Sequence, residues 1–206
     1  PMAVLRTLLA SLALLTAGVW VLAGVTDGFR AFTTETARRI GVREHPPAVP
    51  PLPLQTADGG RTRFGALRGR WLLVDFIYTR CETYCSVQGG EFARLQRRLA
   101  GPIASGKVAL LSVSFDPGHD EPAALADYQR RGGDLGAGWI AARPLDHADL
   151  AALMRVFGVI AVPDRLGGFV HNAAIAVVDP DSRLVAILNW DDPRAAARYV
   201  TRRLTP

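Results

Sequence analysis

The sequence predicts an α/β domain that follows a single N-terminal membrane-spanning helix. An uncharged apolar run occupies residues 8–25. Two short apolar segments, 71–78 and 108–115, flank an amphipathic helical pattern, and another pair, 173–178 and 184–188, is separated by a turn sequence. The chain of 206 residues is long enough for one ordinary domain together with a preceding segment.

The composition indicates a folded chain with a modest positive charge. Hydrophobic residues make up 49% of the chain and charged residues 21%, which excludes intrinsic disorder as its overall state. The net charge of +5 comes almost entirely from arginine, because Lys107 is the only lysine. Arg94, Arg97 and Arg98 follow helical spacing with no interleaved aromatic residues, so we interpret them as a solvated helix face and expect no nucleic-acid partner.

Residues 8–25 predict a transmembrane helix. The run LLASLALLTAGVWVLAGV is within the roughly 17–25 residues that a helix needs to cross a bilayer. A cleavable signal peptide is the alternative, but its apolar region usually has only about 7–15 residues, and a clear A-x-A cleavage site is missing here. We therefore expect a retained single-pass anchor over residues 1–26.

The charges on either side of the apolar run bear on the orientation of this anchor. Arg6 alone precedes the apolar run, and the arginines that follow it are more numerous: Arg30, Arg38, Arg39 and Arg43. The positive-inside rule therefore argues against export of the domain.

A proline-rich segment separates the anchor from the domain. Five of the eight residues from 46 to 53 are proline, which favours an extended spacer of the polyproline type over a packed element. We expect a linker over residues 27–54 and a folded domain over residues 55–206.

The first elements of the domain predict a parallel strand–helix–strand unit. The segments WLLVDFIY at 71–78 and VALLSVSF at 108–115 are typical of central strands buried on both faces. Between them, Phe92, Leu95 and Leu99 share one face of a helix, which we expect to stop at Gly101-Pro102. Such a crossover is almost always right-handed.

The later elements complete a thioredoxin-like order. Pro122 suits the first turn of a helix, and Asp146 suits the cap of another. The turn sequence DPDSR at 179–183 joins two apolar strands into a hairpin, and Asp192 caps a last helix that begins at Pro193. Strand, helix, strand, helix, hairpin and terminal helix together predict a thioredoxin-like domain.

Cys81 and Cys85, the only cysteines, follow the first central strand and open the helix after it. Functional groups gather at such carboxyl strand ends, and the helix N-terminus and Arg80 favour thiolates. Two thiolates at this spacing form a reversible disulfide or bind a soft metal. The polar neighbour Glu82 argues against two buried core cysteines, and so short a loop argues against a structural disulfide. Tyr78 stands where a peroxiredoxin-type site has Thr or Ser.

A soft metal bound by two thiolates commonly takes a third ligand, and for copper this ligand is usually an imidazole. We interpret His45 and His147 as solvated or capping residues, and His119 is a weaker candidate at the correct sheet edge. His171 is the strongest candidate, with a purely structural role as its alternative. It follows the irregular stretch VPDRLGGF at 162–169, whose paired glycines permit movement, and precedes a hairpin strand expected beside the cysteine-bearing strand.

Three segments resemble the Sco/SenC family of copper chaperones that assemble cytochrome c oxidase: FIYTRCETYC at 76–85, SVSFDPGHDEP at 112–122 and GGFVHNAAIAVVDPD at 167–181. The resemblance implies a thioredoxin-like fold and one copper ion, Cu(I) or Cu(II), bound by Cys81, Cys85 and His171. It implies a chaperone rather than an enzyme, delivering copper to the binuclear copper (CuA) site of cytochrome c oxidase. The implied partners are the copper-bearing oxidase subunit and other copper carriers or thiol reductants. The implied location is the inner membrane, with the domain facing the periplasm or an equivalent extracytoplasmic space.

A thiol–disulfide oxidoreductase is the alternative function, and redox sensing is a third. In the oxidoreductase, Cys81 attacks a partner disulfide and Cys85 resolves the mixed species, which keeps the oxidase copper-ligand cysteines reduced. Family members usually carry Pro after the first cysteine, often Pro after the second, and Asp before the histidine, where this chain has Glu82, Ser86 and Val170. Val170 removes a possible partner for the imidazole, and Glu82 opposes ionisation of the thiols.

Overall fold

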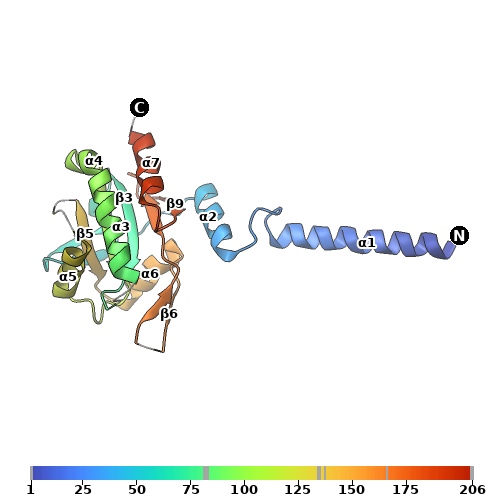
Figure 1. The fold of residues 1–206 in the computed structure, drawn as a ribbon, viewed down its shortest axis with the longest axis horizontal. Coiled ribbons are helices and arrows are strands. Elements are labelled where there is room, and N and C mark those ends of the chain that lie inside the picture. The colour runs from blue at the N-terminus through green and yellow to red at the C-terminus, as the bar shows by residue number, and fades with distance from the viewer. Residues whose placement is uncertain (1, 81–83, 134–135, 137, 166, 205–206) are drawn as a thin grey trace. The chain divides into compact units, whose positions relative to one another are not determined.

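The structure is a computed structural model that describes residues 2–80, 84–133, 136, 138–165 and 167–204, with the backbone alone for residues 84–88. The chain divides into two compact units, Pro1–His45 and Pro46–Pro206, which are described separately. Figure 1 labels the α-helices of both units and several strands of the second.

The first unit contains two helices, α1 (Met2–Val25) and α2 (Thr34–Glu44). Helix α1 is the one described helix that is long and apolar enough to cross a membrane, with a mean hydropathy of 2.2 over its best window. Helix α2 forms inside the segment that the sequence predicted as a linker. Its start is fixed by Thr33, whose hydroxyl oxygen accepts a hydrogen bond from the amide of Thr36 at 3.1 Å.

The second unit contains a seven-stranded sheet in the order β2-β1-β5-β4-β3-β8-β9. Strands β3, β4 and β5 are parallel to one another, and the outer pairs are antiparallel. The strands of the sheet are β1 Pro53–Thr56, β2 Arg61–Arg63, β3 Trp71–Ile77, β4 Val108–Ser114, β5 Trp139–Pro144, β8 Ile175–Val178 and β9 Leu184–Leu188. A separate antiparallel pair joins β6 (Ala161–Pro163) to β7 (Phe169–His171).

Helices pack on both faces of this sheet (Figure 1). They are the 3-10 helix η1 Phe64–Leu67, α3 Tyr84–Arg98, α4 Ala100–Ala104, α5 Pro122–Gly132, α6 His147–Phe157 and α7 Pro193–Leu204. On one face, Phe92 of α3 and Tyr128 of α5 each lie 5.9 Å, between ring centroids, from Trp139 of β5. Helix α7 packs beside α3.

The opposite face is covered by α6. Trp139 and Leu73 belong to one row across the sheet, because each is in register with Leu110. Phe76 lies three residues after Leu73 and therefore points to the other face. There its ring centroid lies 5.1 Å from that of Phe157 at the end of α6. The central strands are thus buried on both faces, as their largely apolar sequences predicted.

The thioredoxin-like order, the parallel β3–β4 pair and the β8–β9 hairpin are confirmed, and β8 pairs with β3 as expected. The helix starts are confirmed too. Pro122 occupies the first turn of α5. The carboxylate of Asp146 accepts a hydrogen bond from the Asp149 amide at 2.8 Å, and that of Asp192 accepts one from Ala195 at 2.9 Å.

Several elements were missed. Strand β5 was not predicted because its sequence, WIAARP, mixes apolar and charged residues. The prediction that Gly101-Pro102 stops the helix was wrong, since the short helix α4 (Ala100–Ala104) follows α3 at once and takes Pro102 into its first turn. The irregular stretch 162–169 is largely the β6–β7 hairpin, whose strands of three residues are too short to give a period-two signal.

The linker limits also need correction. Residues 46–54 are packed against the domain instead of forming a free spacer, with Val49 and Leu54 buried. The Val49 amide donates to the carbonyl of Ser182 at 2.8 Å, and Ala48 forms an isolated bridge with Arg183. An extended proline-rich backbone still offers the amides and carbonyls between its prolines to a neighbouring chain segment, which is why this stretch packs.

Candidate metal centre

The predicted site lies where β3 and β4 end. Tyr78 and Phe115, the residues that follow these strands, are both buried, and their ring centroids lie 5.4 Å apart. The cysteine segment, residues 81–85, leads from the end of β3 into α3, whose first residue is Tyr84. Cys81 lies outside the described residues, and Cys85 is the second residue of α3, described by its backbone alone.

His171, the last residue of β7, is brought to this same end of the sheet. Its ring centroid lies 5.1 Å from that of Phe115 and 6.4 Å from that of Tyr78. Its Nδ1 atom is buried and has no hydrogen-bond partner among the described residues. Burial among these aromatic rings lowers the pKa of His171. The imidazole is therefore held neutral, which is the state in which histidine binds metals.

Tyr78 fixes the hairpin that carries His171. Its hydroxyl oxygen accepts a hydrogen bond from the Phe169 amide at 3.2 Å and donates to the Phe169 carbonyl at 3.3 Å. A Cβ at Gly168 would lie 2.9 Å from this hydroxyl oxygen, so the close approach requires glycine at that position. The glycine that the sequence suggested as a source of movement thus serves close packing.

A buried carboxylate ties the two strand ends together. Asp120 is fully buried and accepts hydrogen bonds from the Thr79 amide at 3.1 Å, the Thr79 hydroxyl at 2.6 Å and the Ser114 hydroxyl at 2.6 Å. Burial raises the pKa of Asp120, although these three donors stabilise its ionised form. Thr79 immediately precedes Arg80 and Cys81, so Asp120 fixes the backbone from which the cysteine segment departs.

Arg80 and His119 share one carboxylate. A guanidinium nitrogen of Arg80 lies 2.7 Å from the carboxylate of Asp116, and the His119 Nδ1 lies 2.9 Å from the same carboxylate. Burial disfavours ionised Asp116, but the hydrogen bonds from His119 and Arg80 outweigh it and lower the pKa of Asp116. The sequence predicted that the positive charge of Arg80 favours thiolates at the cysteines. That charge is also paired with Asp116. The His119 side chain is 58% exposed, which fits a surface partner of Asp116.

The two remaining histidines that the sequence singled out, His45 and His147, are exposed. His45 is the exposed C-cap of α2, and His147 is the exposed first residue of α6. Val170 is 69% exposed and points to the opposite face of β7 from His171. An acidic side chain at position 170 would thus project away from the imidazole, so we expect its loss to matter less than the sequence suggested. Glu82 lies outside the described residues, and for Ser86 the backbone alone is described.

Sequence reasoning missed the residues that hold the centre together, Tyr78, Phe115 and Asp120. A signal existed for Asp120, because an acidic residue follows a largely apolar strand within the short segment DPGHD. No sequence signal pairs Tyr78 with Phe169, which lies 91 residues away.

Comparison with known proteins decides the family. The sequence pattern of SCO1/SenC matches residues 42–205, which is most of the chain and includes every residue of the centre. The chain belongs to the SCO1/SenC family. The family assignment that the three segments suggested is confirmed, and so is the thioredoxin-like fold.

Individual relatives agree with this assignment. The SCO1 protein homolog of Bacillus subtilis (strain 168) is 25% identical over 143 residues, covering 68% of this chain and 73% of the homolog. The structure of Bradyrhizobium japonicum ScoI with copper bound is 26% identical with a TM-score of 0.63, covering 76% of this chain and 99% of that one. BsSco, described with a disulfide switch as a member of the Sco family of cytochrome c oxidase assembly proteins, shares the fold at 24% identity and a TM-score of 0.63, covering 77% of this chain and 95% of that one.

We predict that Asp120→Ala lowers the free energy of unfolding by about 2–4 kcal/mol, because three donors that meet at this buried carboxylate lose their acceptor. Urea denaturation followed by circular dichroism measures the change. Asp181→Ala, in the exposed turn between β8 and β9, is the control and should stay within about 0.5 kcal/mol of the unchanged chain. Equal losses for the two variants would contradict the role given to Asp120.

We predict that the metal-free protein loses stability through His171 as the pH falls from about 7 to about 5. The unfolded histidine binds a proton near its ordinary pKa of about 6.5, whereas native His171 has a lowered pKa and binds it only at lower pH. Stability is thus fully present above the unfolded pKa and declines below it. His171→Gln should reduce this decline in urea titrations across that pH range, and His147→Gln should not. An unchanged decline in His171→Gln would show that the imidazole is not held neutral by burial.

Proposed function

We propose that this protein is a membrane-anchored copper chaperone that holds copper through Cys81, Cys85 and His171 and delivers it to the CuA site of cytochrome c oxidase. The observation that carries the proposal is the unpartnered, buried Nδ1 of His171, presented at the end of the sheet from which the cysteine segment departs. A buried ring nitrogen without a partner costs about 1–3 kcal/mol, and a bound metal ion satisfies it. Membership of a family of cytochrome c oxidase assembly proteins, with a copper-bound relative, supports the same function.

The donor set fits copper. Thiolates are soft ligands that favour Cu(I), and a neutral imidazole suits copper in either oxidation state. Two thiolates suffice to retain Cu(I), whereas Cu(II) depends more strongly on the nitrogen. Copper is the cargo of this protein, so the site must release it. Release by stepwise ligand exchange requires that thiolates or imidazoles of the acceptor protein reach the metal.

Separate hydrogen bonds fix the backbone that precedes the cysteines and the backbone that precedes His171. Asp120 holds Thr79 at the base of the cysteine segment, and Tyr78 holds Phe169 two residues before His171. Tyr78 is itself joined to Thr79 along the chain. The two sets of ligands are thus positioned from neighbouring residues at the end of β3, which favours a site formed before the metal arrives.

Thiol–disulfide exchange requires only two sulfurs and gives no role to His171. The copper function accounts for the buried imidazole, and the exchange function leaves it without a partner. The two functions therefore differ in what removal of His171 should do.

The same proposal places α1 in the inner membrane, with the domain on the extracytoplasmic side where the CuA site is assembled. The length and hydropathy of α1 support anchoring. The arginines after the apolar run oppose this orientation, so the topology needs its own test.

We predict that protease added to intact spheroplasts digests the domain and leaves a membrane-protected fragment that contains α1. A cytoplasmic marker protein must survive in the same sample. Full protection of the domain would place it in the cytoplasm and overturn the delivery proposal.

We predict that His171→Ala weakens Cu(II) binding by more than about 10-fold, with a smaller loss for Cu(I), because one ligand is removed and the soft thiolates remain. The reduced full chain in detergent is titrated with copper against a competing chelator. His119→Ala is the matched control and should bind copper as the unchanged chain does. Formation of the Cys81–Cys85 disulfide, read as an alkylation mass shift, should be unaffected in both variants.

Two outcomes contradict the proposal. Unchanged copper affinity in His171→Ala would exclude the three-ligand site and favour the oxidoreductase. A large loss in His119→Ala would assign the third ligand to His119.

A further inference from the structure

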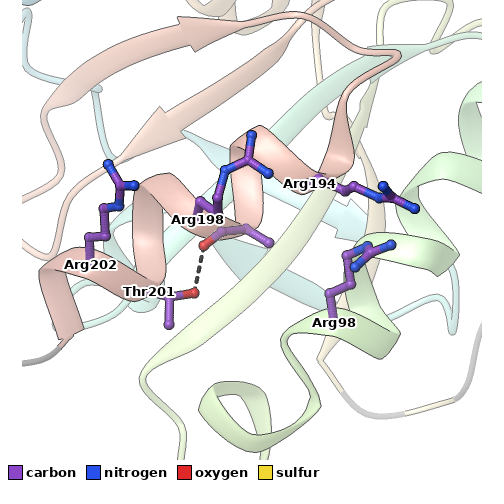
Figure 2. Close-up of a pocket in the computed structure, with 6 residues that line it drawn as sticks. Arg98, Arg194, Arg198, Thr201 and Arg202 are labelled. Carbon is purple, nitrogen blue, oxygen red and sulfur yellow. Dashed lines mark hydrogen bonds between the residues drawn. The ribbon is translucent and has the colours of Figure 1, made fainter.

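A pocket of about 540 Å³ lies between α3 and α7, apart from the residues of the candidate metal centre. Its lining residues are Arg98, Arg194, Ala197, Arg198, Thr201 and Arg202. Figure 2 shows Arg194, Arg198 and Arg202 along α7, with Arg98 contributed by the neighbouring helix. The volume is within the range of about 300–1,000 Å³ that is usual for small-ligand sites.

The arginines of α7 follow one stripe of the helix, at positions four residues apart. Like charges at this spacing repel one another, by about 0.2–0.5 kcal/mol for each pair. Helix α7 carries no acidic residue that would offset them. Among the described residues, Arg98, Arg194 and Arg198 form no ion pair, whereas Arg94, one turn before Arg98 on α3, pairs with Glu91.

Acidic groups do lie nearby, in an adjoining pocket of about 290 Å³ that shares Arg98 and Arg194. Glu91 there is paired with Arg94, and Asp192 accepts a hydrogen bond from the Ala195 amide at the start of α7. Asp191 is the remaining carboxylate of that pocket. The acidic groups are therefore gathered beyond the Arg194 end of the stripe, and every charged residue that lines the arginine pocket is an arginine.

We propose that the arginine pocket is a binding site for a phosphate group, outside the copper chemistry of the protein. A guanidinium presents parallel N–H donors that match two phosphate oxygens, and several such groups around one cavity suit a ligand with more than one negative charge. The Thr201 hydroxyl donates to the Ala197 carbonyl at 2.6 Å, so the donors offered to a ligand are those of the arginines. A phosphate bound here also relieves the repulsion along α7.

The phosphate comes either from a free polyphosphate or from the headgroup of an anionic lipid, since α1 is apolar enough to keep this chain at a membrane. Both sources offer the same recognition chemistry. The experiment therefore needs one arm for each source.

The test is calorimetric titration of the copper-free full chain in a nonionic detergent with inorganic pyrophosphate, and separately with dihexanoyl-phosphatidylglycerol or dihexanoyl-phosphatidylcholine. The variants are the double substitution Arg194→Gln with Arg198→Gln, and the single substitution Arg98→Gln on the other helix. The control is Arg61→Gln with Arg63→Gln, which removes the same charge from two exposed positions of β2. Circular dichroism melts check that all variants are folded.

We expect the α7 double variant to bind pyrophosphate at least about 10-fold more weakly, since two charge-assisted contacts are lost. Arg98→Gln should weaken binding several-fold, and the β2 control should match the unchanged chain. Phosphatidylglycerol binding more tightly than both phosphatidylcholine and pyrophosphate identifies a lipid headgroup as the source. Pyrophosphate binding with no preference between the two lipids identifies a free phosphate.

Three results overturn the proposal. The first is that neither pyrophosphate nor phosphatidylglycerol binds. The second is an equal loss of binding in the β2 control, which would reflect net charge alone. The third is tight binding of an aspartate-rich peptide that pyrophosphate does not displace. The last result would assign the pocket to an acidic protein partner.

Discussion

The buried carboxylate of Asp120 connects the ends of the two central strands, and the candidate metal centre depends on that connection. It accepts three hydrogen bonds, two from Thr79 after β3 and one from Ser114 at the end of β4. Parallel pairing alone brings these ends to one edge of the sheet, but it does not fix the chain beyond them. By binding Thr79, Asp120 fixes the chain for two residues beyond β3, toward the cysteine segment. The burial that disfavours its charge is tolerated because these three donors are directed at the carboxylate.

The second half of the centre reaches the same place through aromatic packing. Tyr78, Phe115, Phe169 and His171 form one cluster, in which each neighbouring pair of rings is tilted or edge-on. Such contacts place the imidazole without using its nitrogens, which remain available for a ligand. The cluster excludes water from Nδ1 and lowers the pKa of His171, so one packing arrangement provides both position and protonation state.

Helix α3 links the candidate metal centre to the arginine pocket. It begins at Tyr84, one residue before Cys85, and ends at Arg98, which lines the arginine pocket with α7. Its buried face, with Phe92 and Leu95, packs on the sheet. The helix therefore carries Cys85 of the candidate metal centre in its first turn and one wall of the arginine pocket at its last residue.

The sequence by itself determined the fold class, because the short apolar runs at 71–78 and 108–115, separated by a crossover helix, are typical of central parallel strands. It also determined the apolar N-terminal helix and the family, and it marked Cys81, Cys85 and His171 as the residues to examine. These signals are local: periodicity, caps such as Asp146, and short motifs read from neighbouring positions.

Tertiary structure decided which of these residues meet and in what state. The contact between Tyr78 and Phe169 spans 91 residues, and no pattern along the chain encodes it. The packing of residues 46–54 and the pocket shared by Arg98 and α7 also arise from elements distant in sequence. Edge strands and the hairpin of His171 were missed for the same reason, since strands of three or four residues are stabilised by their partners rather than by their own propensity.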